Sequence, residues 1–222
     1  MEETRKFSCI DCTVTACNKK KGVPEKSYPS FCPTPGLTLE ELDGEKEIFE
    51  SAMNEYDDEY VRKITKAAAE VEYENYCRHT RVEEVMDFAR KIGAHKIGIA
   101  TCAGLIRESR TLAGILRSHG FEVVGFCCKT GAVNKHEVGI PECCENIGFN
   151  MCNPILQAKM LNAEKTELNL VVGLCVGHDS LFYRYSDALV TTVVTKDRVL
   201  GNNPVQALYT AESYYKKLYN PD

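Results

Sequence analysis

The chain after residue 95 alternates short apolar segments with amphipathic ones, and this alternation restricts the possible folds more than any other feature of the sequence. The apolar segments that we expect to form strands are Lys96–Thr101, Phe121–Phe126, Leu168–Leu174 and Ala188–Val194. Helices between successive strands return the chain to the same end of the sheet, so the strands are expected to be parallel. The pattern predicts an α/β fold, a Rossmann-like doubly wound parallel sheet of about four strands.

Residue types typical of helix ends mark the helices around these strands. A helix over about 105–118 is expected after the first strand. The Asn-Pro pairs at 153–154 and 203–204 each offer a favourable N-cap and first helical residue. We expect a short helix after His178, and a last helix that begins at the second Asn-Pro pair and continues to about Tyr219.

The sequence before the first strand has a different character. We divide the chain into a Cys-rich segment, a helical segment and the Rossmann-like domain, at 1–36, 37–93 and 94–222. The first segment has no helical or strand periodicity. In the second, Thr80 and Glu83 have the spacing of a capping box, and Gly93 is a suitable C-terminal cap.

Charge and hydrophobicity limit the classes of partner. Lys and Arg number 27 against 32 Asp and Glu, so neither nucleic acid nor an anionic membrane is an expected partner. The longest apolar run, around 168–176, is far below the roughly 18 residues that a membrane span needs. The first ten residues hold no apolar core of a secretory signal, so we expect a cytoplasmic protein.

Twelve of the 222 residues are cysteine. In a reducing cytosol this number favours metal ligands or redox groups over disulfides. Disulfides remain the alternative, because intracellular proteins of hyperthermophiles use them.

Four cysteines form the first group, in the spacing Cys9-x2-Cys12-x4-Cys17-x14-Cys32. A segment without its own core gains order from coordination, because the free energy of metal binding becomes free energy of folding. Three crowded ligands and a distant Cys followed by Pro favour an iron–sulfur cluster, with zinc as the alternative at this site. A flexible tail with unliganded thiols is the remaining interpretation.

A second group lies at one expected edge of the sheet: Cys102, Cys128 and Cys175 follow strands, and Cys152 stands beside the helix start at Asn153. Parallel strands place their carboxyl ends at one edge, and for strand order 2-1-3-4 Cys102 and Cys175 would flank the crevice between the first and third strands. We expect these four thiols to bind a second metal centre. The alternative is that they are buried small hydrophobes. The roles of Cys77, Cys127, Cys143 and Cys144 stay open.

Two further features lie near this edge. His178 follows the third strand and is the candidate catalytic proton donor, with a capping or core role as the alternative. The turn Lys196-Asp197-Arg198 is either a plain surface turn or a charged clamp over the site. No GxGxxG fingerprint and no P-loop follows the strands, so nucleotide binding is not indicated.

Four segments of the chain carry a family resemblance: 96–105, 151–158, the GLCVGHDSLF block at 173–182, and 196–204. Together they resemble a prokaryotic family of unknown function described as uncharacterised metal-binding proteins. The resemblance implies metal binding and no established reaction. Cys102, Cys128, Cys152, Cys175 and His178 match the pattern of that family, whereas Cys143 and Cys144 do not.

These observations favour an iron–sulfur protein with two Cys-ligated centres, of the 4Fe–4S type, in electron transfer or redox chemistry. An electron-donor protein and a small-molecule substrate at the sheet edge are the expected partners, and an iron–sulfur oxidoreductase is the favoured enzyme class. The alternative is a non-catalytic zinc-binding or metal-sensing module. A metal-free thiol reductase is disfavoured, because no CxxC lies at a strand–helix junction.

Overall fold

The computed structural model describes residues 8–18, 27–38 and 43–220. It divides into two compact units, 1–66 and 67–222, which are described separately. The first unit contains short 3-10 turns and the helix α1 (Asp43–Asn54). The helix α2 (Glu59–Glu74) contains the boundary between the units.

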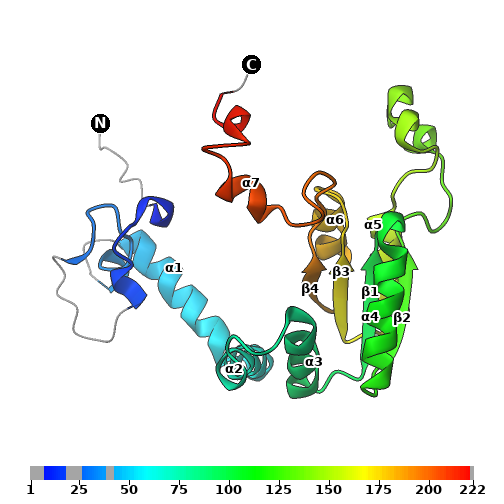
Figure 1. Ribbon diagram of the computed structural model, residues 1–222. Coiled ribbons are helices and arrows are strands. Elements are labelled where there is room, and N and C mark those ends of the chain that lie inside the picture. Colours follow the sequence, from blue (N-terminus) through cyan, green and yellow to red (C-terminus); the bar gives the residue numbers. More distant parts are fainter. Residues whose placement is uncertain (1–7, 19–26, 39–42, 221–222) are drawn as a thin grey trace. The chain divides into compact units, whose positions relative to one another are not determined.

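The second unit is an α/β domain (Figure 1). After α2 its helices are α3 (Arg81–Ile92), α4 (Ile106–Ser118), α5 (Pro154–Ala163), α6 (His178–Tyr185) and α7 (Val205–Tyr209). Its strands are β1 (Lys96–Thr101), β2 (Glu122–Cys127), β3 (Leu168–Val172) and β4 (Leu189–Val194). All pairings are parallel, in the order β2-β1-β3-β4. The predicted Rossmann-like parallel sheet is confirmed.

Two apolar layers cover the two faces of this sheet. One layer joins β1, β2 and β3 to α3 and α4, through residues such as Met86 and Leu116. The other joins the sheet to α5 and α6, through Leu161 and Phe182. Figure 1 shows α4 and α5 on opposite sides of β1 and β2. The chain therefore crosses to opposite faces from β1 and from β2, which creates a switch point between the carboxyl ends of β1 and β3.

The predicted ends of α3 and the predicted start of α5 are confirmed. The Glu83 carboxylate accepts hydrogen bonds from the Thr80 N–H and hydroxyl, both at 2.7 Å, and completes the capping box of α3. Gly93 ends α3 with a φ of 76°, in the left-handed region that glycine adopts without strain. Asn153 Oδ1 accepts from the Leu156 N–H at 2.9 Å, and Pro154 is the first residue of α5.

The prediction for the last helix was wrong. α7 begins at Val205 and ends at Tyr209, and the chain then continues in turns instead of reaching Tyr219 as a helix. Exposure explains the early end, because Leu208, Tyr209 and Tyr214 are 72%, 74% and 91% exposed. A short helix without an apolar surface to pack on is marginal in water.

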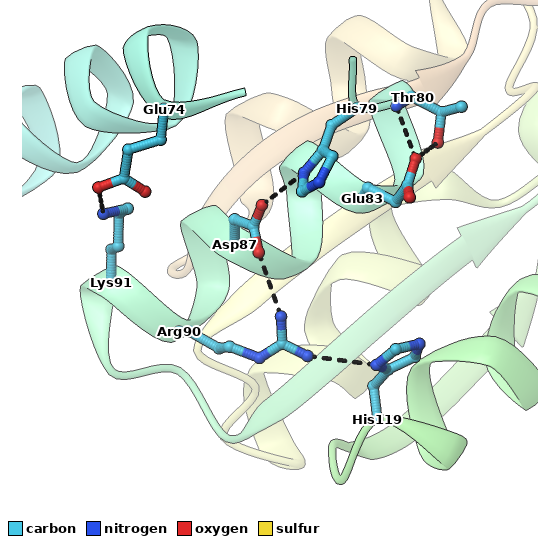
Figure 2. A network of polar contacts seen from close by, with 8 residues as sticks. All are labelled: Glu74, His79, Thr80, Glu83, Asp87, Arg90, Lys91 and His119. Atoms are coloured by element: carbon cyan, nitrogen blue, oxygen red, sulfur yellow. Dashed lines mark hydrogen bonds and ion pairs between the residues drawn. The ribbon is translucent and has the colours of Figure 1, made fainter. Parts of the chain in front are cut away.

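A polar network joins the turn before α3 to the end of α4 (Figure 2). His79 Nδ1 lies 2.8 Å from Asp87 Oδ2, and the other oxygen of Asp87 accepts from Arg90 at 3.2 Å. Arg90 also lies 3.3 Å from His119 Nδ1 and stacks over the Phe121 ring. Because His119 and Phe121 directly precede β2, this network stabilises the amino edge of the sheet and leaves the carboxyl edge to other residues.

Two glycines in the second unit provide a matched test of the packing. A Cβ at Gly98 in β1 would collide with Asn169 Oδ1 and lie 3.0 Å from Leu161 Cδ1. Asn169 is fully buried, and its amide is fixed by Thr166 at 2.7 Å and Ser186 at 2.9 Å. A Cβ at Gly114 in α4 would meet nothing within 4 Å.

We therefore expect opposite effects on the free energy of unfolding, measured by urea denaturation. Gly98→Ala should lower it by about 1–3 kcal/mol, because overpacking displaces the Asn169 amide. Gly114→Ala should raise it by about 0.5–1 kcal/mol, because alanine favours the helix. A Gly98→Ala protein as stable as the parent would contradict the close β1–β3 packing.

Candidate metal centre

Three of the predicted cysteine ligands gather at the carboxyl edge of β1 and β2. The Cys102 N–H donates to Val172 O at 3.1 Å, and the Cys128 N–H donates to Thr101 O at 2.8 Å. The Asn153 N–H donates to Cys128 O at 2.8 Å, which places Cys152 beside them. These backbone bonds continue the parallel ladder past the strand ends, so the sheet itself holds the cysteines.

The side chains form a row of hydrogen bonds. Cys128 interacts with both Cys102 and Cys152, and Cys152 also interacts with His178 at the start of α6, through hydrogen bonding that shifts the pKa of each group. The Ala103 N–H donates to Cys128 Sγ at 3.4 Å. Cys128 is 2% exposed, whereas Cys102, Cys152 and His178 are partly exposed. The middle of the row is therefore buried, and solvent reaches its ends.

This row separates the pKa values of the three thiols. The hydrogen bond from Cys128 is the main cause that lowers the pKa of Cys102 to about 5, and the positive charge of Lys196 adds to it. Hydrogen bonds from Cys128 and then His178 lower the pKa of Cys152 to about 3. Cys128 shows the opposite effect, because its proton stabilises both neighbours and its pKa is raised. The Cys152 thiolate raises the pKa of His178. The set thus favours two thiolates beside an imidazolium.

Gln157 in α5 holds the strand ends that carry Cys102 and Cys128. This role was not predicted from the sequence. The Gln157 side chain is fully buried, and Nε2 donates to Thr101 O at 3.1 Å and to Phe126 O at 2.7 Å. It therefore ties α5 to the ends of β1 and β2, next to Cys102 and Cys128. The signal in the sequence was the amide side chain of Gln157 among the apolar residues of this helix.

Cys175 lies at the same edge with a different partner. β3 ends at Val172, earlier than the predicted Leu174, because Gly173 turns with a φ of 64°. Cys175 therefore follows the strand by three residues, and its sulfur accepts a hydrogen bond from Arg198 at 2.9 Å. The row of hydrogen bonds contains Cys102, Cys128, Cys152 and His178, and Cys175 is held separately.

The first unit contains the N-terminal cysteine group. The Ser8 N–H donates to Phe31 O at 3.4 Å, which brings the stretch with Cys9 beside the stretch with Cys32. The Cys12 N–H donates to Cys9 O at 3.2 Å, and the Thr15 N–H donates to Cys12 Sγ at 3.4 Å. Cys17 lies on the following 3-10 turn and is exposed. Backbone contacts therefore bring Cys9, Cys12 and Cys32 into one neighbourhood.

All twelve cysteines are free thiols. Across residues 8–18, 27–38 and 43–220, no group of three or more Cys, His, Asp or Glu side chains is arranged so that it could hold a metal ion. Of the cysteines without a predicted role, Cys127 is the last residue of β2, Cys143 and Cys144 lie on a 3-10 turn over 142–147, and Cys77 is exposed.

Comparison with known proteins gives a family. Residues 41–193 match the family described as Protein of unknown function (DUF1847). The chain is also 43% identical over 176 residues to "Uncharacterized protein MJ0455" of Methanocaldococcus jannaschii, an alignment that covers 79% of this chain and 90% of that protein.

The chain belongs to the DUF1847 family. The expectation of an uncharacterised family is thereby confirmed, while neither description mentions a metal. The part that matches the DUF1847 family contains every residue of the sheet-edge group, from Cys102 to His178. The N-terminal cysteines and Lys196–Arg198 lie outside it. Among the described residues, no helix is both long and apolar enough to cross a membrane.

The row of thiols predicts an unusual pH profile for Cys102 in the reduced, chelator-treated protein. An ordinary thiol has a pKa of about 8.5, and its alkylation by iodoacetamide accelerates roughly tenfold per pH unit below that value. With a pKa of about 5, Cys102 is already a thiolate at neutral pH, so its rate should stay nearly constant between about pH 6 and pH 8. Mass spectrometry of the labelled peptides measures the rate.

Removal of the hydrogen-bond donor provides the check. Cys128→Ala should raise the pKa of Cys102 and make its alkylation rate depend on pH. Cys127→Ala is the matched control, since it changes the neighbouring residue at the end of β2 and should leave the flat profile intact. A parent protein in which Cys102 already follows the profile of a free thiol would contradict the row.

Proposed function

We propose that this chain is an iron–sulfur protein in redox chemistry, with a sheet-edge centre on Cys102, Cys128 and Cys152 and with Cys175 as fourth ligand. The observation that supports this proposal is the row of interacting thiols that come from the ends of β1 and β2 and from the start of α5. Thiols that only fill a core have no reason to meet at the edge where parallel sheets bind ligands.

Two thiols of the donor set, Cys102 and Cys152, fit a thiolate-bound cluster, whereas Cys128, with its raised pKa, would lose its proton to the bound metal. Metal ligation needs deprotonated sulfur, and the surroundings of Cys102 and Cys152 lower the pKa of both. Cys102 and Cys152 are partly exposed, which would let a metal ion or cluster reach these thiols, whereas Cys128 is buried. Cys175 lies on the adjacent strand connection, and Arg198 donates a hydrogen bond to it.

The residues around the thiols have separable roles in this proposal. An iron–sulfur cluster supplies one-electron transfer when it is bound. His178 contacts Cys152 and holds a proton at the partly exposed end of the row, where it is the candidate donor to a substrate. Gln157 fixes the strand ends that carry Cys102 and Cys128.

The N-terminal group is proposed to hold a second cluster. Cys9, Cys12 and Cys32 lie on stretches that backbone hydrogen bonds bring together, and Cys17 follows on the next turn. Within the described residues 8–18 and 27–38, the one buried apolar side chain is Ala16. So little burial cannot order this segment. Metal binding would order it, because the free energy of binding becomes free energy of folding.

Zinc is the second candidate, and the position of His178 favours it. Three cysteines and one histidine are a common ligand set of structural zinc, and His178 already contacts Cys152. In that case the chain would be a zinc-binding or metal-sensing module without redox chemistry.

Metal and acid-labile sulfide analysis of anaerobically purified protein distinguishes the two candidates. Two four-iron clusters should give about eight iron and about eight sulfide per chain, with thiolate-to-iron charge-transfer absorption. Cys152→Ala should reduce both values to about half, since it removes a ligand of one centre only.

Cys77→Ala is the control for this measurement, because Cys77 is exposed and outside both groups. It should leave the iron and sulfide content unchanged. Zinc without sulfide would support the binding module and overturn the iron–sulfur proposal. An unchanged metal content in Cys152→Ala would contradict the sheet-edge centre.

The N-terminal centre predicts a difference in proteolysis. In metal-loaded protein, Cys12→Ala should make the first 36 residues sensitive to trypsin, because that segment loses a ligand, while the α/β domain stays resistant. Thr13→Ala, which changes an exposed neighbour, should behave like the parent. Mass spectrometry identifies the cleavage products. Equal resistance of Cys12→Ala and the parent would show that metal does not order the segment.

A further inference from the structure

We propose that the loop after β4 makes the sheet-edge site selective for a small anion, a carboxylate or an oxyanion, with Lys196 and Arg198 as the selecting residues. This inference rests on the proposed function, because the anion would be the reactant of the centre described above. Its test is made in metal-free protein, so the two proposals can fail separately.

Two cations of this loop reach the thiols of two neighbouring strands. Arg198 donates to Cys175 Sγ at 2.9 Å, on the connection after β3. Lys196 lies at the same edge, where its charge acts on Cys102 after β1. A Cβ at Gly173 would collide with Leu105 Cδ1 and lie 3.4 Å from Lys196 Cε. Because glycine has no side chain, the Lys196 side chain can pass close to the backbone at this position.

The loop is fixed by its own acidic residue. The Asp197 carboxylate accepts from the N–H groups of Val199 at 2.9 Å and Leu200 at 2.7 Å. The Asn202 N–H donates to Asp197 O at 2.8 Å and closes the turn. The only carboxylate of the loop therefore binds backbone and forms no ion pair with the two cations on either side of it.

Within the described residues, Lys196 and Arg198 form no ion pair, whereas Lys91 and Lys96 each pair with two glutamates. A third cation, Lys129, acts on Cys152 and donates to Asn150 O at 2.6 Å. Among the acidic groups, Asp179 acts on His178. The charges of Lys196 and Lys129 therefore act on these thiols, Arg198 contacts Cys175, and residue 198 is exposed on the surface.

A nearby cavity argues that the anion belongs at the thiols. This cavity, of about 580 Å³, lies beside the end of β4 and is lined by Leu105, Glu108, residues 193–195 and residues 201–204. Its charged lining group is a carboxylate, which repels anions. Lys196 and Arg198 are not among its lining residues and act on the cysteines instead.

Two charged thiol reagents of similar size test the selectivity at Cys175. Sulfonatoethyl methanethiosulfonate is anionic and its trimethylammonium analogue is cationic. Each modification rate in metal-free protein is measured by mass spectrometry and divided by the rate of that reagent with free cysteine. We expect the anionic reagent to be favoured by about tenfold at low salt, and less at high ionic strength. The ionisation of Cys175 cancels, because both reagents meet the same thiol.

The double variant Lys196→Met, Arg198→Met should bring the ratio to about one. Lys196→Met alone, which keeps the bond between Arg198 and Cys175, should lower the ratio in part. Arg184→Met removes an exposed cation from the last turn of α6 and should leave the ratio unchanged. A ratio near one in the parent, or an equal loss in Arg184→Met, would overturn the anion site whatever metal the protein holds.

Discussion

The continuation of the parallel ladder beyond β1 and β2 is the interaction on which the candidate site depends. Cys102 donates to Val172 O, Cys128 donates to Thr101 O, and Asn153 donates to Cys128 O. Each bond fixes a stretch of backbone that would otherwise belong to a free loop. The register of the sheet therefore sets the positions of the cysteines. Side chains on a loop need separate contacts to hold a geometry, whereas these three thiols are positioned by the same bonds that hold the strands.

Electrostatics explains why this arrangement is a poor way to fill a core. A buried apolar site disfavours thiolates, yet the surroundings of Cys102 and Cys152 stabilise them through the proton of Cys128 and the charges of Lys196 and Lys129. Packing alone would be satisfied by neutral thiols. A site that favours anionic sulfur at partly exposed positions is suited to bind a metal ion or cluster.

The periodic parts of the fold could be predicted, and the irregular parts could not. Alternation of apolar segments located the strands, and Asn153 with Pro154 located the start of α5. The end of β3 depends on the left-handed turn at Gly173, and propensity does not locate such a turn within a continuous apolar run. The bond from Gln157 to two carbonyl groups depends on tertiary packing, as does the early end of α7. For the site, the sequence located the strand-end cysteines but not the order of their hydrogen bonds.

The position of Cys175 then has a physical explanation within the proposed centre. A thiolate that ligates a cluster retains lone pairs, and hydrogen bonds to such sulfurs are one of the means by which proteins set the reduction potential. Arg198 offers Cys175 a charged donor, and His178 offers one to Cys152. A positive group beside a ligand sulfur favours the reduced, more negative state of a cluster. The same charge that would attract an anionic reactant would thus also make the centre easier to reduce.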